Sequence, residues 1–444
     1  MFVHTTRRSR PALIALAVLL AVSACVESTP EAGESTTAIA ESTETTAASA
    51  ETTQATTSET TTGEAMDAPE EIVIGNPIAL TGPNNAGASL SQIPTYDLWA
   101  ADVNAAGGIY VAEYDQQIPV RIERVDDTSD VGTAVQLVQQ MLEEGDVDFI
   151  FPPWGTASNV AIAPIVSEFQ SPVMGCTVSS KDLADSAADY PYFYTMLNQG
   201  AAQGDALVQL AQELGISRVA VIHHDDLHGI EFAEDVVPAL EEAGIEIAVN
   251  ETYPVNTEDL SQTLRAAQSA DVDALLAFSY PPETFLMTGQ MMEIGFNPDL
   301  FYATVGVAFP AYRDTFGPAA EGIMGAGVWN PNVEIEGAQD FFDRHVGMHG
   351  TEPDRWASAA CYASGEVLQQ AIEAAGTLDP VAVKEALDTT EFSTILGDFR
   401  FENQFNPVYP GQVGQWQNGE FEIVSYADDR TAEPVYPKAE WPAG

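Results

Sequence analysis

Basic residues are scarce in this chain of 444 residues. Lys and Arg number 15 against 67 Asp and Glu, so the formal net charge is −52 at neutral pH. Because an acidic surface repels phosphate groups, nucleic acid and anionic lipid surfaces are poor partners. Salt screens the self-repulsion of such a surface, and a saline habitat is therefore one interpretation of the composition.

Familiar catalytic motifs are absent beyond residue 24. The sequence contains no GxSxG, GxxxxGK, HExxH or CxxC, and no GxGxxG that opens a helix. With 67 acidic residues, close pairs of carboxylates arise by chance and nominate no acid/base pair. We therefore predict that the protein is not an enzyme and uses no cofactor, with a secreted hydrolase as the remote alternative.

Cysteine is also rare, and the first of three cysteines has a special context. Arginines, the short apolar run 12–22 and small residues precede Cys25, which resembles a bacterial lipobox. We expect residues 1–24 to be a signal peptide that is removed before Cys25 is lipidated. The other two, Cys176 and Cys361, can form one disulfide or remain as buried thiols, and the sequence leaves both alternatives open.

The segment that follows Cys25 lacks aromatic residues, Lys and Arg. Thr, Ser, Ala, Gly and Glu dominate residues 26–71, and such a composition cannot bury enough apolar surface to fold. We expect residues 25–71 to be a disordered tether with a reach of about 35–40 Å. The protein would then be extracytoplasmic and held at the bacterial cell membrane by its lipid anchor alone; an interaction tail is the alternative.

From Glu71 onward, short apolar runs alternate with amphipathic segments. Two such series, over about 72–195 and 197–327, predict two similar α/β lobes with doubly wound parallel sheets. Helical spacing of apolar residues is clear at 134–142, for example. The expected strands are 72–74, 120–122, 148–151, 172–174, 219–222, 245–247 and 274–278.

Several stretches, taken together, resemble type I periplasmic solute-binding proteins, the group that includes the Leu/Ile/Val-binding proteins of ABC importers. The resemblance runs from about Glu71 to Trp441. The stretches are Ile78–Pro83, Val103–Ile109, Val125–Asp130, Ala161–Pro164, Ile395–Phe401 and Gly414–Gly419.

The resemblance implies two lobes joined by three crossovers. Lobe 1 would hold 72–196 plus 328–405, and lobe 2 would hold 197–327 plus 406–444. A ligand would lie at the carboxyl ends of the strands and be enclosed by hinge closure. The expected function is to bind a small amino-acid-like, carboxylate or amide solute as a monomer and deliver it to the permease and ATPase of an ABC importer. A ligand-sensing receptor subunit of the same fold is the alternative.

In lobe 1, the resemblance assigns an anion-binding site to two turns. The family's Gly-Pro-aromatic-Ser-Ser stretch ends here in Trp154, Gly155 and Thr156, which places Thr156 where a Ser binds the ligand carboxylate. Ser179 and the backbone of Thr177 would complete the site from the next turn. Helix N-caps are the alternative reading of these residues.

In lobe 2, the resemblance assigns ligand contacts to Tyr280 and His228. Where amino-acid binders place a carboxylate for the ligand ammonium, this chain has Val305. Since burying an unpaired ammonium is costly, the acceptor would have to be Glu283, Asp226 or a backbone carbonyl. The identity of the ligand therefore stays open.

The stretch VIHHDDLHG, residues 221–229, raises the question of a metal site. His224 and His228 are four residues apart, with Asp225 and Asp226 between them. That spacing brings two rings to one side only on a helix, whereas a strand leading into a turn is expected here. We therefore expect the two rings to lie apart and no metal to bind.

Overall fold

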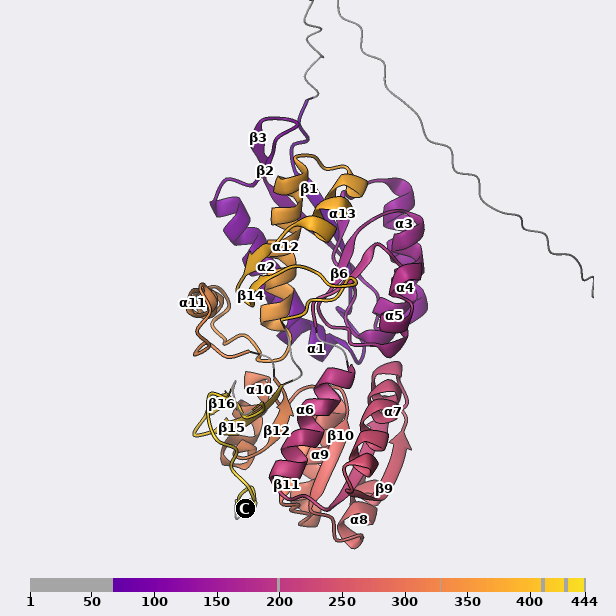
Figure 1. Cartoon of the computed structure of the whole chain (residues 1–444), viewed down its shortest axis with the longest axis vertical. Helices are drawn as coiled ribbons and strands as arrows, with labels where there is room; N and C mark the ends of the chain where they lie inside the picture. The colour runs from indigo at the N-terminus through magenta and orange to yellow at the C-terminus, as the bar shows by residue number, and fades with distance from the viewer. Residues whose placement is uncertain (1–66, 198–199, 328, 409–411, 427–429, 443–444) are drawn as a thin grey trace, which may run out of the picture. The chain divides into compact units, whose positions relative to one another are not determined.

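The computed structural model describes residues 67–197, 200–327, 329–408, 412–426 and 430–442 (Figure 1). The chain divides into two units, 1–62 and 63–444. The predicted signal peptide, Cys25 and the tether up to residue 66 lie outside the described residues. Among the helices that are described, none combines the length and apolar character needed to cross a bilayer.

The helix α3, Val131–Glu144, shows how the sequence specifies its own elements. Its N-cap Asp130 accepts a hydrogen bond from the N–H of Thr133, and its last turn ends at Gly145 with φ of 68°. Ala134 and Val138, one turn apart, are fully buried on its inner face. The capping residues and the apolar spacing together set where this helix begins and ends.

The first lobe is built around a three-stranded parallel sheet, in the order β4-β1-β5 among the described residues. A parallel pair, β6 and β7, lies next to it in the chain. In Figure 1, α3 and α4 run along one side of β1, and α2 and α12 lie on the other. The strands are β1 (Ile72–Ile78), β4 (Val120–Asp126), β5 (Phe149–Ile150), β6 (Val173–Gly175) and β7 (Phe193–Thr195), with the hairpins β2 (Ile109–Val111)/β3 (Gln116–Ile118) and β13 (Phe392–Thr394)/β14 (Gly397–Phe399).

The helices of this lobe come from two parts of the chain. The first part supplies α1 (Asn85–Leu90), α2 (Gln92–Ala105), α3, α4 (Thr156–Glu168) and α5 (Lys181–Asp185). The second supplies α11 (Ala338–His349), α12 (Ser358–Ala375) and α13 (Pro380–Thr389).

The second lobe is built around a sheet of seven described strands, in the order β16-β15-β12-β11-β10-β8-β9. The pairs from β9 to β12 are parallel, whereas β15 and β16 add an antiparallel edge that the sequence did not predict. The strands are β8 (Arg218–His224), β9 (Glu246–Tyr253), β10 (Ala274–Phe278), β11 (Leu300–Ala303), β12 (Met324–Ala326), β15 (Val413–Gln417) and β16 (Glu420–Ile423).

Helices cover both faces of this sheet, because nearly every residue of its central strands is buried. Val221 of β8 packs in one core cluster with α6 (Gly200–Glu213) and α7 (Leu227–Glu242). Its neighbour Ile222 packs in another with α8 (Ser261–Ser269) and α9 (Pro281–Ile294). A short helix, α10 (Pro310–Phe316), follows β11. Burial on both faces is the pattern expected of parallel strands.

The described chain passes between the lobes three times: from β7 to α6, from β12 to α11, and from β14 to β15. The first and third passages lie side by side, because the N–H of Asn406 donates to the carbonyl of Thr195 at 3.0 Å. This is the predicted fold class, two doubly wound α/β lobes joined by three crossovers.

A disulfide joins Cys176, in the loop after β6, to Cys361 of α12, with 5.0 Å between the Cα atoms. Of the two alternatives left open by the sequence, the structure therefore shows the bonded one. The bridge holds the loop that continues into Thr177 and Ser179 against the body of the first lobe.

Candidate functional site

A cavity of about 140 Å³ lies where loops from the two lobes meet. In the first lobe its wall is formed by loops after β1, β4 and β5, and in the second by loops after β8, β9 and β10. Carboxyl ends of parallel strands are the usual place for ligands in α/β folds. Among the residues of the wall are Asn84, Ser129 and Trp154 from the first lobe and Asp226, Asn256 and Tyr280 from the second.

Tyr280 connects the two lobes at this cavity. It precedes α9 directly, and its hydroxyl accepts a hydrogen bond from the backbone N–H of Thr156 at 3.3 Å. The same hydroxyl is hydrogen-bonded to the carboxylate of Asp226. Its ring meets Trp154 edge to face, with 4.9 Å between the ring centroids. Trp154, Gly155, Thr156 and Tyr280, all predicted as site residues, are thus brought together.

Thr177 and Ser179 lie close to this group and bond to it. The N–H of Gly155 donates to the Thr177 hydroxyl at 3.3 Å, and the Thr156 hydroxyl donates to the Ser179 carbonyl at 3.5 Å. The Ser179 hydroxyl is buried and has no hydrogen-bond partner in the described part of the chain. Gly155 and Trp154 form the cavity wall, whereas Thr156, Thr177 and Ser179 are not part of it.

His228, in the first turn of α7, is buried behind Tyr280. The two rings are stacked, with centroids 5.3 Å apart and planes 8° apart. Its Nε2 lies 3.1 Å from the hydroxyl of Thr304, and the ring is not part of the cavity wall. Burial lowers the pKa of His228 to about 4, so the imidazole is neutral at neutral pH.

The expectation that His224 and His228 lie apart is wrong. Their rings stack with 5.6 Å between centroids, because α7 begins at Leu227 and turns back over the end of β8. Gly229 permits this close approach, since a Cβ there would lie 2.4 Å from the carbonyl oxygen of His224. Within the described residues, no group of three or more potential metal ligands is present.

Val305 has no carboxylate to accept a ligand ammonium, and Asp226 and Glu283 were the acids considered in its place. Of these two, Asp226 is on the cavity wall. Burial raises the pKa of its carboxyl, and the hydrogen bond from Tyr280 partly offsets that effect. Glu283 is buried and accepts the N–H of Asn256 at 2.9 Å, and burial raises its pKa too. The order of residues alone favours none of these acids, because the approach of the two lobes decides which one meets the cavity.

Three polar residues of the wall were not predicted as site residues, and they occupy equivalent positions in the fold. Asn84, Ser129 and Asn256 each lie in the loop that follows a strand. Their position as polar residues in loops that follow expected strands was the available signal.

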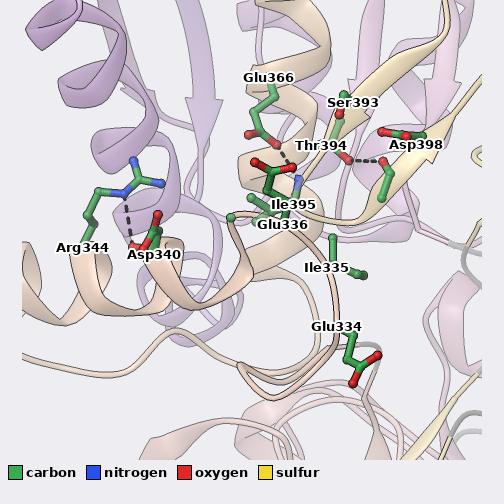
Figure 2. A pocket seen from close by; sticks show the side chains of 12 residues that line it. Glu334, Ile335, Glu336, Asp340, Arg344, Glu366, Ser393, Thr394, Ile395 and Asp398 are labelled. Carbon is green, nitrogen blue, oxygen red and sulfur yellow. Dashed lines mark hydrogen bonds between the residues drawn. The ribbon is translucent and has the colours of Figure 1, made fainter.

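A larger cavity, of about 510 Å³, lies between α11, α12 and the β13–β14 hairpin (Figure 2). Its wall is acidic, with five carboxylates and Arg344, and no strand of the second sheet contributes to it among the described residues. Glu366 accepts the N–H of Ile395 there at 3.0 Å. Because it is confined to one side of the fold, this cavity cannot enclose a solute by lobe closure.

Known proteins resemble most of this chain. The family model described as periplasmic binding protein matches residues 71–420. The Leu/Ile/Val-binding protein homolog 7 of Brucella abortus (strain 2308) is 23% identical over 377 residues, which covers 79% of this chain and 89% of the relative.

Solved structures share the fold at lower identity. The branched-chain amino acid transporter substrate binding protein LivJ of Streptococcus pneumoniae, in complex with isoleucine, has a TM-score of 0.70 at 18% identity, covering 83% of this chain and 100% of LivJ. An ABC transporter solute binding protein of R. palustris, in complex with benzoate, has a TM-score of 0.71 at 15% identity. The match covers 82% of this chain and 97% of the R. palustris protein.

Proposed function

Because the chain belongs to the periplasmic binding protein family, we propose that it captures a small solute between its lobes and delivers it to the permease and ATPase of an ABC importer. The family consists of solute-binding proteins that work outside the cytoplasm. The proposal includes a lipid anchor at Cys25, which would keep the receptor near its permease on a tether.

The observation that carries this proposal is the shared cavity. Three loops from each lobe form its wall, and the Thr156 N–H meets the Tyr280 hydroxyl across the two lobes. A wall divided in this way opens when the lobes separate and encloses a solute when they close. The absence of a recognised catalytic motif fits capture and release without reaction.

The size and surface of the cavity favour a small solute with a polar end and an apolar part. A cavity of about 150 Å³ is enough to hold benzene, and the one here is of similar size. Trp154, Val131 and Val255 supply apolar wall, and Asn84 and Ser129 supply polar wall. Relatives that carry isoleucine or benzoate support an amino-acid-like, carboxylate or amide solute as the class to test.

A thermal-shift screen of the purified protein tests the function directly. The screen would cover amino acids, short amides, urea-like compounds and aromatic acids, and each hit would be titrated by calorimetry. A receptor binds one equivalent and releases the solute unchanged. Conversion of a hit into product would contradict the proposal and restore the hydrolase alternative.

Substitution of the residues that meet between the lobes tests the site. Tyr280→Ala removes the ring from Trp154 and the contact with Thr156, and we expect affinity for the best hit to fall at least about tenfold. Thr156→Ala removes one hydroxyl hydrogen bond, for which about fivefold is expected. Tyr110→Ala, at an exposed tyrosine of β2, is the matched control. Unchanged affinity in both site variants would refute the site.

A further inference from the structure

The charge on the cavity wall is carried by a single residue. Of the described residues that form the wall, Asp226 alone bears a formal charge, and no Lys or Arg is among them. Asp226 lies at the N-cap of α7, directly after β8, and its carboxylate bonds to the Tyr280 hydroxyl. The N–H of Leu227 is a second donor to this carboxylate, and two donors still leave a carboxylate with further accepting capacity.

Two buried acids stand behind this wall. Burial raises the pKa of both carboxyl groups, to about 6 for Asp127, so Asp127 is still mostly ionised at neutral pH. Asp127 accepts the N–H of the wall residue Ser129 at 2.8 Å, and Glu283 accepts the N–H of Asn256 at 2.9 Å. Each has a side chain that is 2% exposed. Neither has a salt-bridge partner among the described residues, so neither charge is neutralised by a neighbouring base.

The Thr156 hydroxyl, which the resemblance assigned to a ligand carboxylate, donates to the Ser179 carbonyl. The Ser179 hydroxyl has no partner among the described residues, but it is not part of the cavity wall. The N–H of Gly155 donates to Thr177, and the N–H of Thr156 donates to Tyr280. The rings of Trp154 and Tyr280 are part of the wall, and aromatic faces attract cations. An anion placed beside Asp226 would meet a like charge in a partly desolvated site, which is unfavourable.

We infer that Asp226 selects solutes carrying a small organic cation, such as an ammonium group, and that its carboxylate contacts this group directly. The inference rests on the proposed function and specifies what its site takes. In a site screened from water, a hydrogen-bonded ammonium–carboxylate pair contributes both affinity and discrimination. Asp226 would then bind the ligand ammonium, which Val305 cannot do because its side chain has no carboxylate.

Three compounds that share one branched alkyl skeleton but differ in charge test which ligand charge the site prefers. Isobutylamine is the cation, isobutyrate the anion and valine the zwitterion, each titrated calorimetrically against the full chain at neutral pH. We expect isobutylamine and valine to bind and isobutyrate not to compete with them. Each titration is repeated in concentrated NaCl, because a protein of net charge −52 attracts cations non-specifically and salt removes that attraction.

Two near-isosteric variants then separate a direct contact from a general effect of net charge. Asp226→Asn keeps the shape of the side chain and its ability to cap α7, but it removes the charge. We expect at least a tenfold loss of affinity for isobutylamine and valine. Glu234→Gln, an exposed acid on the same helix, is the control that changes net charge equally. Circular dichroism confirms that each variant is folded.

Each outcome decides the matter. An unchanged affinity in Asp226→Asn, an equal loss in Asp226→Asn and Glu234→Gln, or tight binding of isobutyrate would overturn the assignment of Asp226 as a cation contact. Any of these would leave solute capture intact, since a ligand would still bind. If nothing in this set or in the broader screen binds, both the inference and the proposed function fail together.

Discussion

At the scale of single residues, Glu366 illustrates how burial sets a protonation state. Its carboxyl lies in the acidic cavity beside α12 and accepts the N–H of Ile395. Burial raises its pKa to about 7, with the Ile395 bond and Arg344 opposing the effect and Asp102 adding to it. Because the folded-state pKa exceeds the ordinary value, the folded protein loses stability as pH rises through the interval between the two.

Glu366→Gln should therefore stabilise the protein at pH 8 and change little at pH 5. The amide stays neutral and its oxygen can still accept the Ile395 N–H, so the cost of a buried charge is removed. We expect an increase of about 1 kcal/mol, or roughly 2 °C in the thermal midpoint at pH 8. Differential scanning calorimetry at both pH values measures this, with the exposed Glu373→Gln on the same helix as control. Equal shifts at the two pH values would be inconsistent with the raised pKa.

Residue-level prediction succeeded where position in the chain was sufficient. Tyr280 follows the buried strand β10 directly, so its place at a strand end could be inferred from sequence. Its bond to Thr156 could not, because that distance depends on how closely two separate sheets approach. The stacking of His224 on His228 was missed because a glycine allows the helix to turn back over the strand end.

At the scale of elements, α7 of the second lobe is fastened to α5 of the first. Glu231 of α7 is 6% exposed and accepts three hydrogen bonds, from the Ser180 hydroxyl and from the N–H groups of Lys181 and Asp182. The acceptor is a carboxylate and the donors include the first N–H groups of a helix, a favourable pairing. This contact exists only while the lobes are together.

Glu231→Gln should weaken solute binding by favouring lobe separation. One amide oxygen cannot replace both carboxylate oxygens, so we expect about a tenfold loss of affinity, expressed mainly as faster dissociation. Stopped-flow fluorescence with the best solute of the screen measures both rates, and Glu234→Gln on the exposed face of α7 controls for charge. If the dissociation rate were unaffected, Glu231 would have no part in holding the lobes together.

At the scale of the whole molecule, the negative net charge is the main electrostatic influence on stability. With 67 acidic and 15 basic residues, the chain carries a large excess of like charge. Self-repulsion of this kind opposes the compact state, and it is screened within about 10 Å at 0.1 M salt. The described salt bridges are mostly half-exposed and contribute little against it.

Thermal stability should therefore rise with added NaCl. We expect the midpoint to increase by several degrees between about 20 mM and 1 M, with most of the gain at the lower concentrations where screening changes fastest. NaCl is preferred to sulfate, which stabilises proteins by exclusion from their surface whatever their charge. A flat or falling midpoint would argue against both the repulsion and the saline interpretation.

The overall architecture was largely predictable, because apolar strands alternate with amphipathic helices through most of the chain. Residues 219–222 and 274–278 were expected as strands and lie within β8 and β10. The antiparallel edge of β15 and β16 was not foreseen, since Val413–Ile423 alternates too briefly to distinguish it from a loop. The disulfide likewise required the fold, because 185 residues separate its two cysteines.

A crystal structure of the protein with the best solute of the screen tests the central claim most directly. The account predicts the solute in the cavity between the lobes, between Trp154 and Tyr280, with its positively charged group against Asp226. A solute bound in the acidic cavity beside Glu366, or on the surface of one lobe alone, would contradict it.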